Sequence, residues 1–336
     1  MPDTSPPPNS VNGSTQSGRP ETPPPPPEAP ADNTAATPTT SPSAPAKKYG
    51  ASIHPGSSSH ISPDLARAIL ELESCLPLPL WCLVQAGEGQ MSAINEPLWA
   101  ALFDARNTLP EGPIALLIES PGGQAKCAYQ IAKLLTRKCG GFVAIVPRYA
   151  KSAATLLALG ADAIMMGAYA ELGPLDAQFV DIDRERRVSA LEEVQALERL
   201  NAVSLVAIDQ TMNLLVRGTR KRTDVLLPVV MRFVSDMMRP LLENIDAVQY
   251  SQRSRMLRVA EEYAIRLLTP RYGESAQAIA SRLVEDYPDH NFAIDPDEAE
   301  SIGLKLLEPS AEQAKALDNL LPHLNGKTVI GRVHEI

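Results

Sequence analysis

Short apolar runs alternate with segments of helical period between residues 80 and 166, and this alternation narrows the possible folds more than any other feature. Helix-period segments lie near 92–107 and 124–138, and a short helix is expected at 152–159. Strands joined by helical crossovers run parallel, so the pattern predicts an α/β fold with a parallel sheet. The predicted strands are LWCLVQA at 80–86, IALLIE at 114–119, FVAIVP at 142–147 and AIMM at 163–166.

A glycine pair, Gly122-Gly123, follows the strand predicted at 114–119 and precedes a helix. Glycines at such a turn let the backbone approach another group closely and leave N–H donors directed outward. These donors suit a phosphate or a developing oxyanion. A tight turn that needs positive φ angles explains the same pair without any ligand.

Ser152 stands at the start of the short helix 152–159, which ends at Gly160, a residue typical of the position after a helix. Its hydroxyl suits an N-cap, which accepts hydrogen bonds from the first turn, but it equally suits a nucleophile placed where the helix dipole favours negative charge. In a parallel sheet this turn and the glycine pair both lie at the carboxyl ends of strands. We therefore expect them to share one crevice, whose groups are those that acyl transfer requires.

Two further regions have a distinct composition. The first 48 residues, which include ETPPPPPEAP, cannot bury enough apolar surface to offset their ordering entropy, so we predict a disordered tail over 1–48. From about 188 to 285 the sequence is nearly all of helical period. A stripe at 3–4 spacing there predicts core or subunit contact, and the apolar helices of 188–250 predict a homo-oligomer. The stripe consists of Leu191, Val194, Leu197 and Leu200.

Charge and cysteine content exclude several classes of partner. The net charge of −9 provides no basic surface for nucleic acid. The most apolar long stretch, VLLPVVMRFVSDMMRPLL, contains charges and two prolines, which exclude a membrane span.

The cysteines form no CxxC pair and have no nearby histidine, so we expect free thiols in a reducing cytoplasm and no metal. They are Cys75, Cys82, Cys127 and Cys139. No nucleotide, metal or flavin motif is present, so we expect no cofactor.

The motif SPGG at 120–123, followed by SAAT and then LALGADAIMM, resembles the ClpP/crotonase-like superfamily of spiral ββα folds. Within it, PRYAKSAATLLALGADAIMMGAYAELGPLDAQF is most similar to the serine dehydrogenase proteinase family, near signal peptide peptidase A. The later YPDHNFAIDPDEAESIGL (287–304) resembles the element that closes the catalytic domain of ClpP-like proteins. The resemblance implies a catalytic domain over 60–306 with a helical insertion at about 185–285, and then a C-terminal extension over 307–336.

For individual residues, the resemblance implies a serine peptidase whose nucleophile is Ser152. Gly122 and Gly123 match the glycine pair that supplies oxyanion donors, and the N–H of Ala153 matches another donor. Asp162 matches a recurrent acidic residue after the nucleophile helix, for which we expect a structural role in the turn before the strand.

The sequence does not have a general base at the position that either relative, signal peptide peptidase A or ClpP, would predict. Signal peptide peptidase A uses a Ser-Lys dyad, but no lysine occurs between Ser152 and Lys221. Lys151 is adjacent to the serine, and neighbouring residues at a helix start point in different directions. ClpP uses a Ser-His-Asp triad, and aligning its pattern puts Asp176 and His290 at the partner positions with acid and base exchanged. We therefore predict that these two residues complete a triad with the serine. The two lysines are the alternative bases.

The sequence thus predicts a cytoplasmic serine hydrolase that acts on peptides or unfolded protein through an acyl-enzyme. It identifies no unfoldase partner. Two other hypotheses stay open. A crotonase-type acyl-CoA enzyme also uses paired backbone donors, but it needs no serine nucleophile and would use carboxylates as acid and base. A scaffold that keeps the fold without activity is favoured by the missing dyad lysine and by the two alanines after Ser152.

Overall fold

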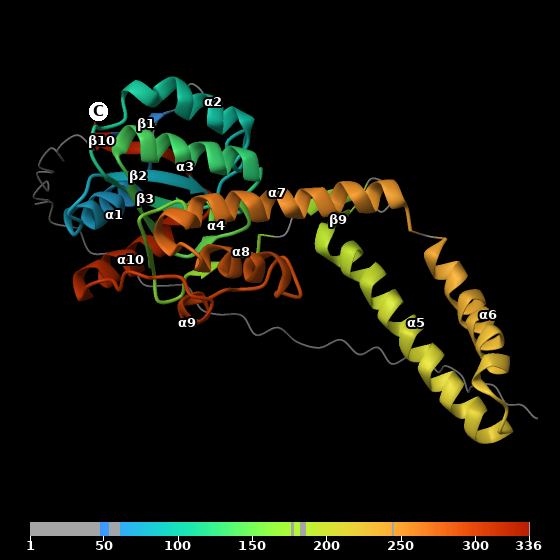
Figure 1. Cartoon of the computed structure of the whole chain (residues 1–336). Helices are drawn as coiled ribbons and strands as arrows, with labels where there is room; N and C mark the ends of the chain where they lie inside the picture. The colour runs from blue at the N-terminus through green and yellow to red at the C-terminus, as the bar shows by residue number, and fades with distance from the viewer. Residues whose placement is uncertain (1–47, 54–60, 176–177, 182–185, 244, 336) are drawn as a thin grey trace, which may run out of the picture. The chain divides into compact units, whose positions relative to one another are not determined.

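A six-stranded sheet in the order β1-β10-β2-β3-β4-β6 lies at the centre of the fold (Figure 1). β2, β3, β4 and β6 run parallel, and β10 is antiparallel to both β1 and β2. The predicted α/β class with a parallel sheet is confirmed, and each predicted strand is present to within one residue. The strands are β1 (Tyr49–Ile53), β2 (Leu80–Gln85), β3 (Ile114–Glu119), β4 (Phe142–Val146), β6 (Ala163–Met166) and β10 (Thr328–Glu335).

This computed structural model describes residues 48–53, 61–175, 178–181, 186–243 and 245–335. The tail predicted at 1–48 lies outside the described residues except for Lys48. Asp176, predicted as a triad member, also lies outside them.

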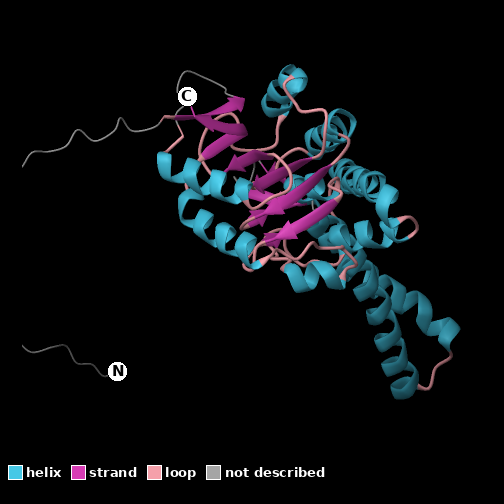
Figure 2. Cartoon of the chain, turned by 90° about the vertical axis from the view of Figure 1, so that its left-hand side faces the viewer, coloured by secondary structure: helices cyan, strands magenta, loops and turns pink. Residues whose placement is uncertain are grey.

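Helices cover both faces of the sheet (Figure 2). The side chains of β3 alternate between two cores: Ile114, Leu116 and Ile118 face one, and Ala115 and Leu117 face the other. A strand buried on both sides is apolar throughout, which explains the unbroken run in this strand. On one face lie α1 (Pro63–Ser74) and α10 (Ala311–Leu324), and on the other α2 (Glu96–Asp104), α3 (Ala125–Cys139) and α4 (Ala153–Leu159).

The end of the chain belongs to the sheet. Strand β10 lies between β1 and β2, with Ile330 opposite both Ile53 and Leu83. Val329 and Val333 of the same strand are buried in the face covered by α1 and α10. The alternation of strands and crossover helices could not reveal this strand, because β10 pairs antiparallel and follows a helix outside the repeating pattern.

The helical character predicted for 188–285 is confirmed. Helices α7 and α8 join the main core, where Leu268 and Leu283 are fully buried. Leu197 and Leu200 of the predicted stripe are partly exposed on α5, and the side chains of Leu191 and Val194 lie outside the described ones. None of the described helices is long and apolar enough to cross a membrane. The helices are α5 (Ala190–Thr219), α6 (Thr223–Leu242), α7 (Ala247–Tyr272) and α8 (Ser275–Glu285).

Helix α4 ends at Gly160 as predicted, but not because of a left-handed backbone. Gly160 has a φ of −77° and remains right-handed. A Cβ added here would lie 2.6 Å from the Cβ of Ala132 on α3 and 3.5 Å from Cδ2 of Leu267 on α7. The glycine therefore allows α4 to pack closely against two other helices.

We predict that Gly160→Ala lowers the free energy of unfolding by about 1–3 kcal/mol, because the added methyl group overpacks this junction. Urea unfolding of the full chain measures the change. Gly112→Ala is the matched control, since nothing lies within 4 Å of a Cβ added there. A Gly160→Ala protein as stable as the control would contradict the close packing.

Candidate active site

The glycine turn and the turn that carries Ser152 lie directly against each other. A Cβ added to Gly122 would lie 2.3 Å from the carbonyl O of Lys151 and 3.0 Å from the Cβ of Ser152. Gly122 also has a φ of 95°, a conformation that side chains disfavour. The structure therefore brings the glycine pair and Ser152 together, as the sequence predicted, and only glycine fits at this contact.

The backbone N–H groups at this contact differ in their partners. The N–H of Gly122 donates to Oγ of Ser120 over 3.1 Å. The N–H groups of Gly123 and Ala153 have no hydrogen-bond acceptor among the described residues. Ala153 is the first residue of α4, where an N–H has no partner within the helix. The available donors are thus Gly123 and Ala153, whereas Gly122, expected to donate as well, contributes the close approach.

Three residues that the sequence analysis did not single out hold the glycine turn in place. Ser120 is fully buried, and its hydroxyl donates to Oε1 of Gln85 over 2.6 Å while it accepts from Gly122. The amide of Gln85 in turn donates to the carbonyl of Met91 over 2.7 Å. Ile94 pairs with the other side of the turn, where its N–H donates to the carbonyl of Gly122 over 2.7 Å.

Ser152 has a strained backbone, with φ 50° and ψ −116°. Among the described residues, positive φ outside glycine occurs only here and at Arg220. Its side chain makes no capping hydrogen bond to α4, so the N-cap interpretation is wrong. Such strain costs about 1–3 kcal/mol and clusters at functional sites. A sharp strand-to-helix turn of this kind exposes the nucleophilic serine of α/β-hydrolases.

A buried threonine joins α4 to the end of β7 (Glu171–Leu172). Oγ1 of Thr155 lies 2.7 Å from the carbonyl O of Ala150 and 2.8 Å from that of Gly173. It also accepts from the N–H of Gly173 over 3.0 Å. A Cβ added to Gly173 would lie 3.3 Å from the backbone N of Ser152, so this segment passes close to the serine as well.

Lys151 is occupied by partners of its own. Its Nζ forms an ion pair with Oε1 of Glu171 at 2.8 Å. It also donates to the carbonyls of Leu172 and Phe292, each over 3.3 Å. An ammonium with three acceptors has no lone pair for the proton of a serine, so this geometry speaks against Lys151 as the base. It serves instead to connect three segments of the chain.

His290 lies partly exposed in the loop between α8 and α9 (Pro296–Ser301). Ile294 fastens this loop to Leu172 through two backbone hydrogen bonds of 2.8 and 3.1 Å. The carbonyl of Phe292 accepts from Lys151. The loop that carries His290 is therefore attached to the residue before Ser152 and to the strand beside it.

The other predicted members of the site lie elsewhere or outside the described residues. Asp176 follows Leu175, whose N–H donates to the carbonyl of Leu283 over 2.8 Å. Lys221 is exposed in the turn between α5 and α6. Gln195 of α5 contacts the end of α8, and the helix between Gln195 and the turn rises roughly 35 Å. Lys221 is thus far from the loop that carries His290.

A buried ion pair supports the turn before Ser152. Glu119, the last residue of β3, has no exposed side-chain surface and accepts from Nε of Arg148 over 2.7 Å and from the N–H of Tyr149 over 3.3 Å. Arg148 also donates to Oδ1 of Asn325 over 2.6 Å. Burial raises the pKa of the Glu119 carboxyl, and the arginine opposes that shift.

Asp162 has the structural role expected for it. Its carboxylate forms an ion pair with Arg271 of α7 at 3.0 Å. Its N–H donates to the carbonyl of Phe142 over 2.6 Å, at the turn before β6. Arg271 also donates to the carbonyl of Leu159 at the end of α4 over 3.0 Å. Asp162 and Arg271 together fix the end of α4 that lies away from Ser152.

The cysteines do not take part in this arrangement. All four are free, and burial raises the pKa of the thiols of Cys82, Cys127 and Cys139, which disfavours reactive thiolates. Within the described ranges, no group of His, Cys, Asp and Glu side chains is placed to hold a metal ion.

Residues 99–223 match the family model of ClpP-like SDH-type serine proteinases. This segment belongs to that family. The resemblance inferred from the sequence is confirmed over the matched residues, which contain the glycine pair and Ser152, whereas His290 lies beyond them.

Two curated proteins of Methanocaldococcus jannaschii, both named as uncharacterized, are similar to the chain. One is 30% identical over 193 residues, which are 57% of this chain and 52% of that protein. The other is 42% identical over 73 residues, 22% of this chain and 25% of that protein. The chain therefore spans about half the length of the first relative and a quarter of the second.

Solved structures give weaker similarities. A mutant of the 1510-N membrane-bound stomatin-specific protease aligns with 76% of this chain and 94% of its own, at 12% identity and a TM-score of 0.41. A ClpP1 mutant from Listeria monocytogenes aligns with 74% of this chain and 99% of its own, at 12% identity and a TM-score of 0.36.

We predict that Ser152→Gly stabilises the protein, because glycine relieves the positive φ at a smaller entropic cost. The expected gain is about 1 kcal/mol, which raises Tm by about 2 °C in a protein of this size. Calorimetry of the full chain measures it. Ser152→Ala retains the Cβ and hence the strain, so its Tm should equal that of the wild type. Equal Tm values for all three proteins would show that the turn is unstrained.

Proposed function

We propose that this chain is a serine peptidase that cleaves peptides or unfolded protein through an acyl-enzyme on Ser152. The observation that carries the proposal is the position of Ser152: a strained turn packed against Gly122, with the N–H groups of Gly123 and Ala153 unpartnered among the described residues. The match of 99–223 to a serine proteinase family supports the same chemistry.

In the proposed reaction, Oγ of Ser152 attacks the carbonyl carbon of the scissile peptide bond and loses its proton to a base. The carbonyl oxygen becomes an oxyanion that accepts from the N–H groups of Gly123 and Ala153. The C–N bond then breaks, and the amine leaves with the proton from the base. Water then attacks the ester carbonyl and loses its proton to the base. The ester C–O bond breaks, the peptide acid leaves, and Oγ of Ser152 takes the proton back. Apart from the attacking water, the proposed steps use only groups of this chain.

His290 is the proposed base, with Asp176 orienting its ring. The support is the attachment of the His290 loop to Lys151 and Leu172, which keeps the loop next to the nucleophile turn. Lys151 then acts as a positioning residue, because its ammonium holds β7 and the carbonyl of Phe292 at once.

The cellular location is part of the proposal. Four free cysteines, three of them buried, fit a reducing compartment, and we assign the protein to the cytoplasm.

We predict that a fluorophosphonate probe modifies Ser152, because the adduct presents an oxyanion to the donors of Gly123 and Ala153. Mass spectrometry of the digested protein locates the adduct. Gly122→Ala should abolish labelling, since its Cβ would displace the carbonyl of Lys151, and Gly112→Ala should label like the wild type. No adduct on the folded wild type would favour the inactive scaffold. Acyl-CoA turnover that survives Ser152→Ala would favour the crotonase-type enzyme.

We predict that peptide hydrolysis rises with pH through one ionisation, that of the imidazole that takes the proton of Ser152. His290→Gln should lower kcat by at least about 100-fold, as expected for loss of a general base, whereas His334→Gln should not. His334 is exposed at the end of β10. Lys151→Met should reduce the rate but leave the ionisation in place. An ionisation that disappears in Lys151→Met would identify the lysine as the base.

A further inference from the structure

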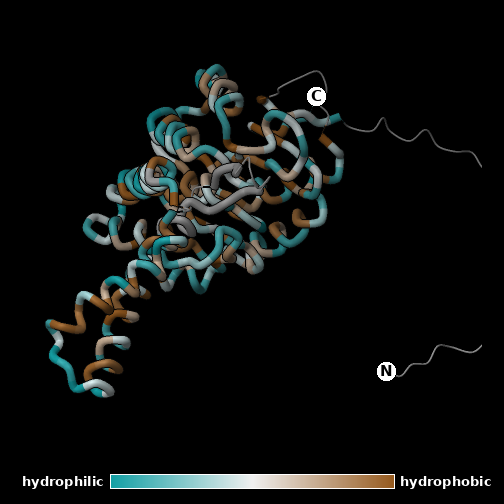
Figure 3. The backbone as a smooth tube through the Cα atoms, turned by 90° about the vertical axis from the view of Figure 1, so that its right-hand side faces the viewer, coloured by the Kyte–Doolittle hydropathy of each residue, from teal (hydrophilic) through white to brown (hydrophobic). Residues whose placement is uncertain are grey.

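The hairpin of α5 and α6 has an internal core of its own, and that core is small. Its buried members are Val230, Val234 and Met238, which pack against partly buried residues of α5. The short turn between the helices makes them antiparallel neighbours. Two helices alone bury only the stripe between them, so the rest of an apolar helix stays exposed. Figure 3 shows long hydrophobic stretches along this hairpin.

Six exposed apolar side chains of the hairpin form a surface that we call the apolar flank. Each directly precedes a residue that faces the other helix, as Val229 precedes Val230 and Leu214 precedes Leu215. A step of one residue turns 100° about a helix axis, and in antiparallel helices this step leads to the same side of the pair. The apolar flank consists of Val203, Val206, Leu214, Val229, Phe233 and Met237, each between 42% and 73% exposed.

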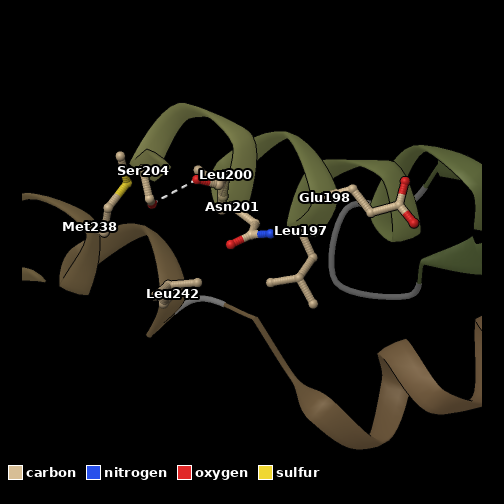
Figure 4. A pocket seen from close by; sticks show the side chains of 7 residues that line it. All are labelled: Leu197, Glu198, Leu200, Asn201, Ser204, Met238 and Leu242. Carbon is tan, nitrogen blue, oxygen red and sulfur yellow. Dashed lines mark hydrogen bonds between the residues drawn. The ribbon is translucent and has the colours of Figure 1, made fainter. Parts of the chain in front are cut away.

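The opposite side of the hairpin has a different composition. The residues that directly follow the inward-facing ones lie there, and they include Asn201, Ser235 and Arg239. Asn201 also lines a pocket of about 400 Å³ between the start of α5 and the end of α6, to which Glu198 contributes as well (Figure 4). The hairpin is therefore apolar on one side and mixed on the other.

The apolar flank is larger than isolated exposed residues would account for. Six half-exposed side chains, with Phe233 among them, present on the order of several hundred Å² in one patch. A patch of this size usually marks a surface that binds a partner or a membrane. The charges around the patch distinguish between these occupants.

The hairpin is cationic in a chain that is acidic as a whole. Residues 199–242 contain seven arginines and lysines against three aspartates and no glutamate, whereas the chain has 31 Lys and Arg against 40 Asp and Glu. None of the three aspartates directly precedes an inward-facing residue, so none lies on the flank side. Asp224 and Asp236 are moreover paired with Arg222 and Arg239.

Cations lie at both ends of the apolar flank. Arg199 is exposed and directly precedes the inward-facing Leu200, which puts it on the flank side at the open end of the hairpin. The tip exposes Arg217, Arg220 and Lys221. A second flank would bring cations together in either direction, tip against tip or tip against Arg199. A continuous anionic surface complements both ends at once.

We infer that the apolar flank binds the surface of a bilayer that contains anionic lipids. The hairpin lies in the plane of the interface, with Phe233 and Met237 below the headgroups and the cations at its two ends beside the lipid phosphates. This contact needs no membrane span, and none of the described helices could form one. The inference concerns the insertion alone and does not depend on peptidase activity.

Flotation of the full chain with vesicles tests the inference. The wild type should float with vesicles of equal parts phosphatidylcholine and phosphatidylserine, and bind pure phosphatidylcholine at least about tenfold more weakly. High salt should weaken the binding to the mixed vesicles.

A pair of matched variants identifies the side that binds. Val229→Glu/Phe233→Glu should lower the affinity for the mixed vesicles at least about tenfold, because it puts two carboxylates on the buried side. Met231→Glu/Ser235→Glu adds the same charge to exposed positions on the opposite side of α6 and should bind nearly as well as the wild type. A wild type that does not float overturns the inference, and so do two variants that bind equally.

Tryptophan fluorescence tests the depth of the flank and needs no added charge. In Phe233→Trp, vesicles that contain brominated phosphatidylcholine should quench the new emission, which should also shift to the blue. Ser235→Trp should show neither change, and the wild type gives the background of Trp81 and Trp99. Equal quenching of both variants overturns the assigned side. A Phe233→Trp emission that is already blue-shifted without vesicles and unchanged by them shows that a second copy covers the flank, and overturns the membrane contact.

Discussion

The close contact between Gly122 and the backbone of Lys151 and Ser152 is the constraint on which the site depends. β3 and β4 are parallel neighbours, so the turns that follow them leave the sheet side by side. Backbone hydrogen bonds between Ser120 and the segment 149–151 continue the pairing past the ends of the strands. The turns can then meet only where one of them has no side chain. Because they meet, Ser152 lies beside the glycine turn, where the N–H of Gly123 has no acceptor among the described residues.

The buried polar side chains are concentrated around this contact. Among the described residues, the buried polar or charged side chains are Gln85, Glu119, Ser120, Thr155 and Arg253, and all but the last surround the two turns. Each of the four is hydrogen-bonded, which offsets the cost of removing it from water. A core that is otherwise apolar tolerates these groups where they fix backbone positions. The strain at Ser152 persists for the same reason, since the surrounding hydrogen bonds overdetermine the turn.

The sequence predicted what depends on local pattern and missed what depends on pairing across the chain. The four parallel strands were predictable because each is a short apolar run between helical segments. β1 and β10 were not, because β10 pairs with β1 and with β2 over more than 240 residues of separation. Serine is preferred at an N-cap and also serves as a nucleophile, so the sequence left both open, and the missing capping bond and the backbone angles of Ser152 speak against the N-cap. The serine of SPGG could have suggested a hydroxyl that holds the glycine turn, but its partner Gln85 lies 35 residues away.

The helical insertion is joined to the site by packing and not only by chain connectivity. α7 packs on α3, where Tyr129 and Tyr263 stack with ring centroids 4.5 Å apart, and on α4, where Leu267 lies against Gly160. Its Arg271 binds both Asp162 and the carbonyl end of α4. α5 packs on this same α7. The loop that carries His290 follows α7 and α8 in sequence and is attached to Leu172 beside the Ser152 turn. The helix that receives α5 is thus also the helix that fixes one end of α4, so the insertion is part of what holds α4 in place.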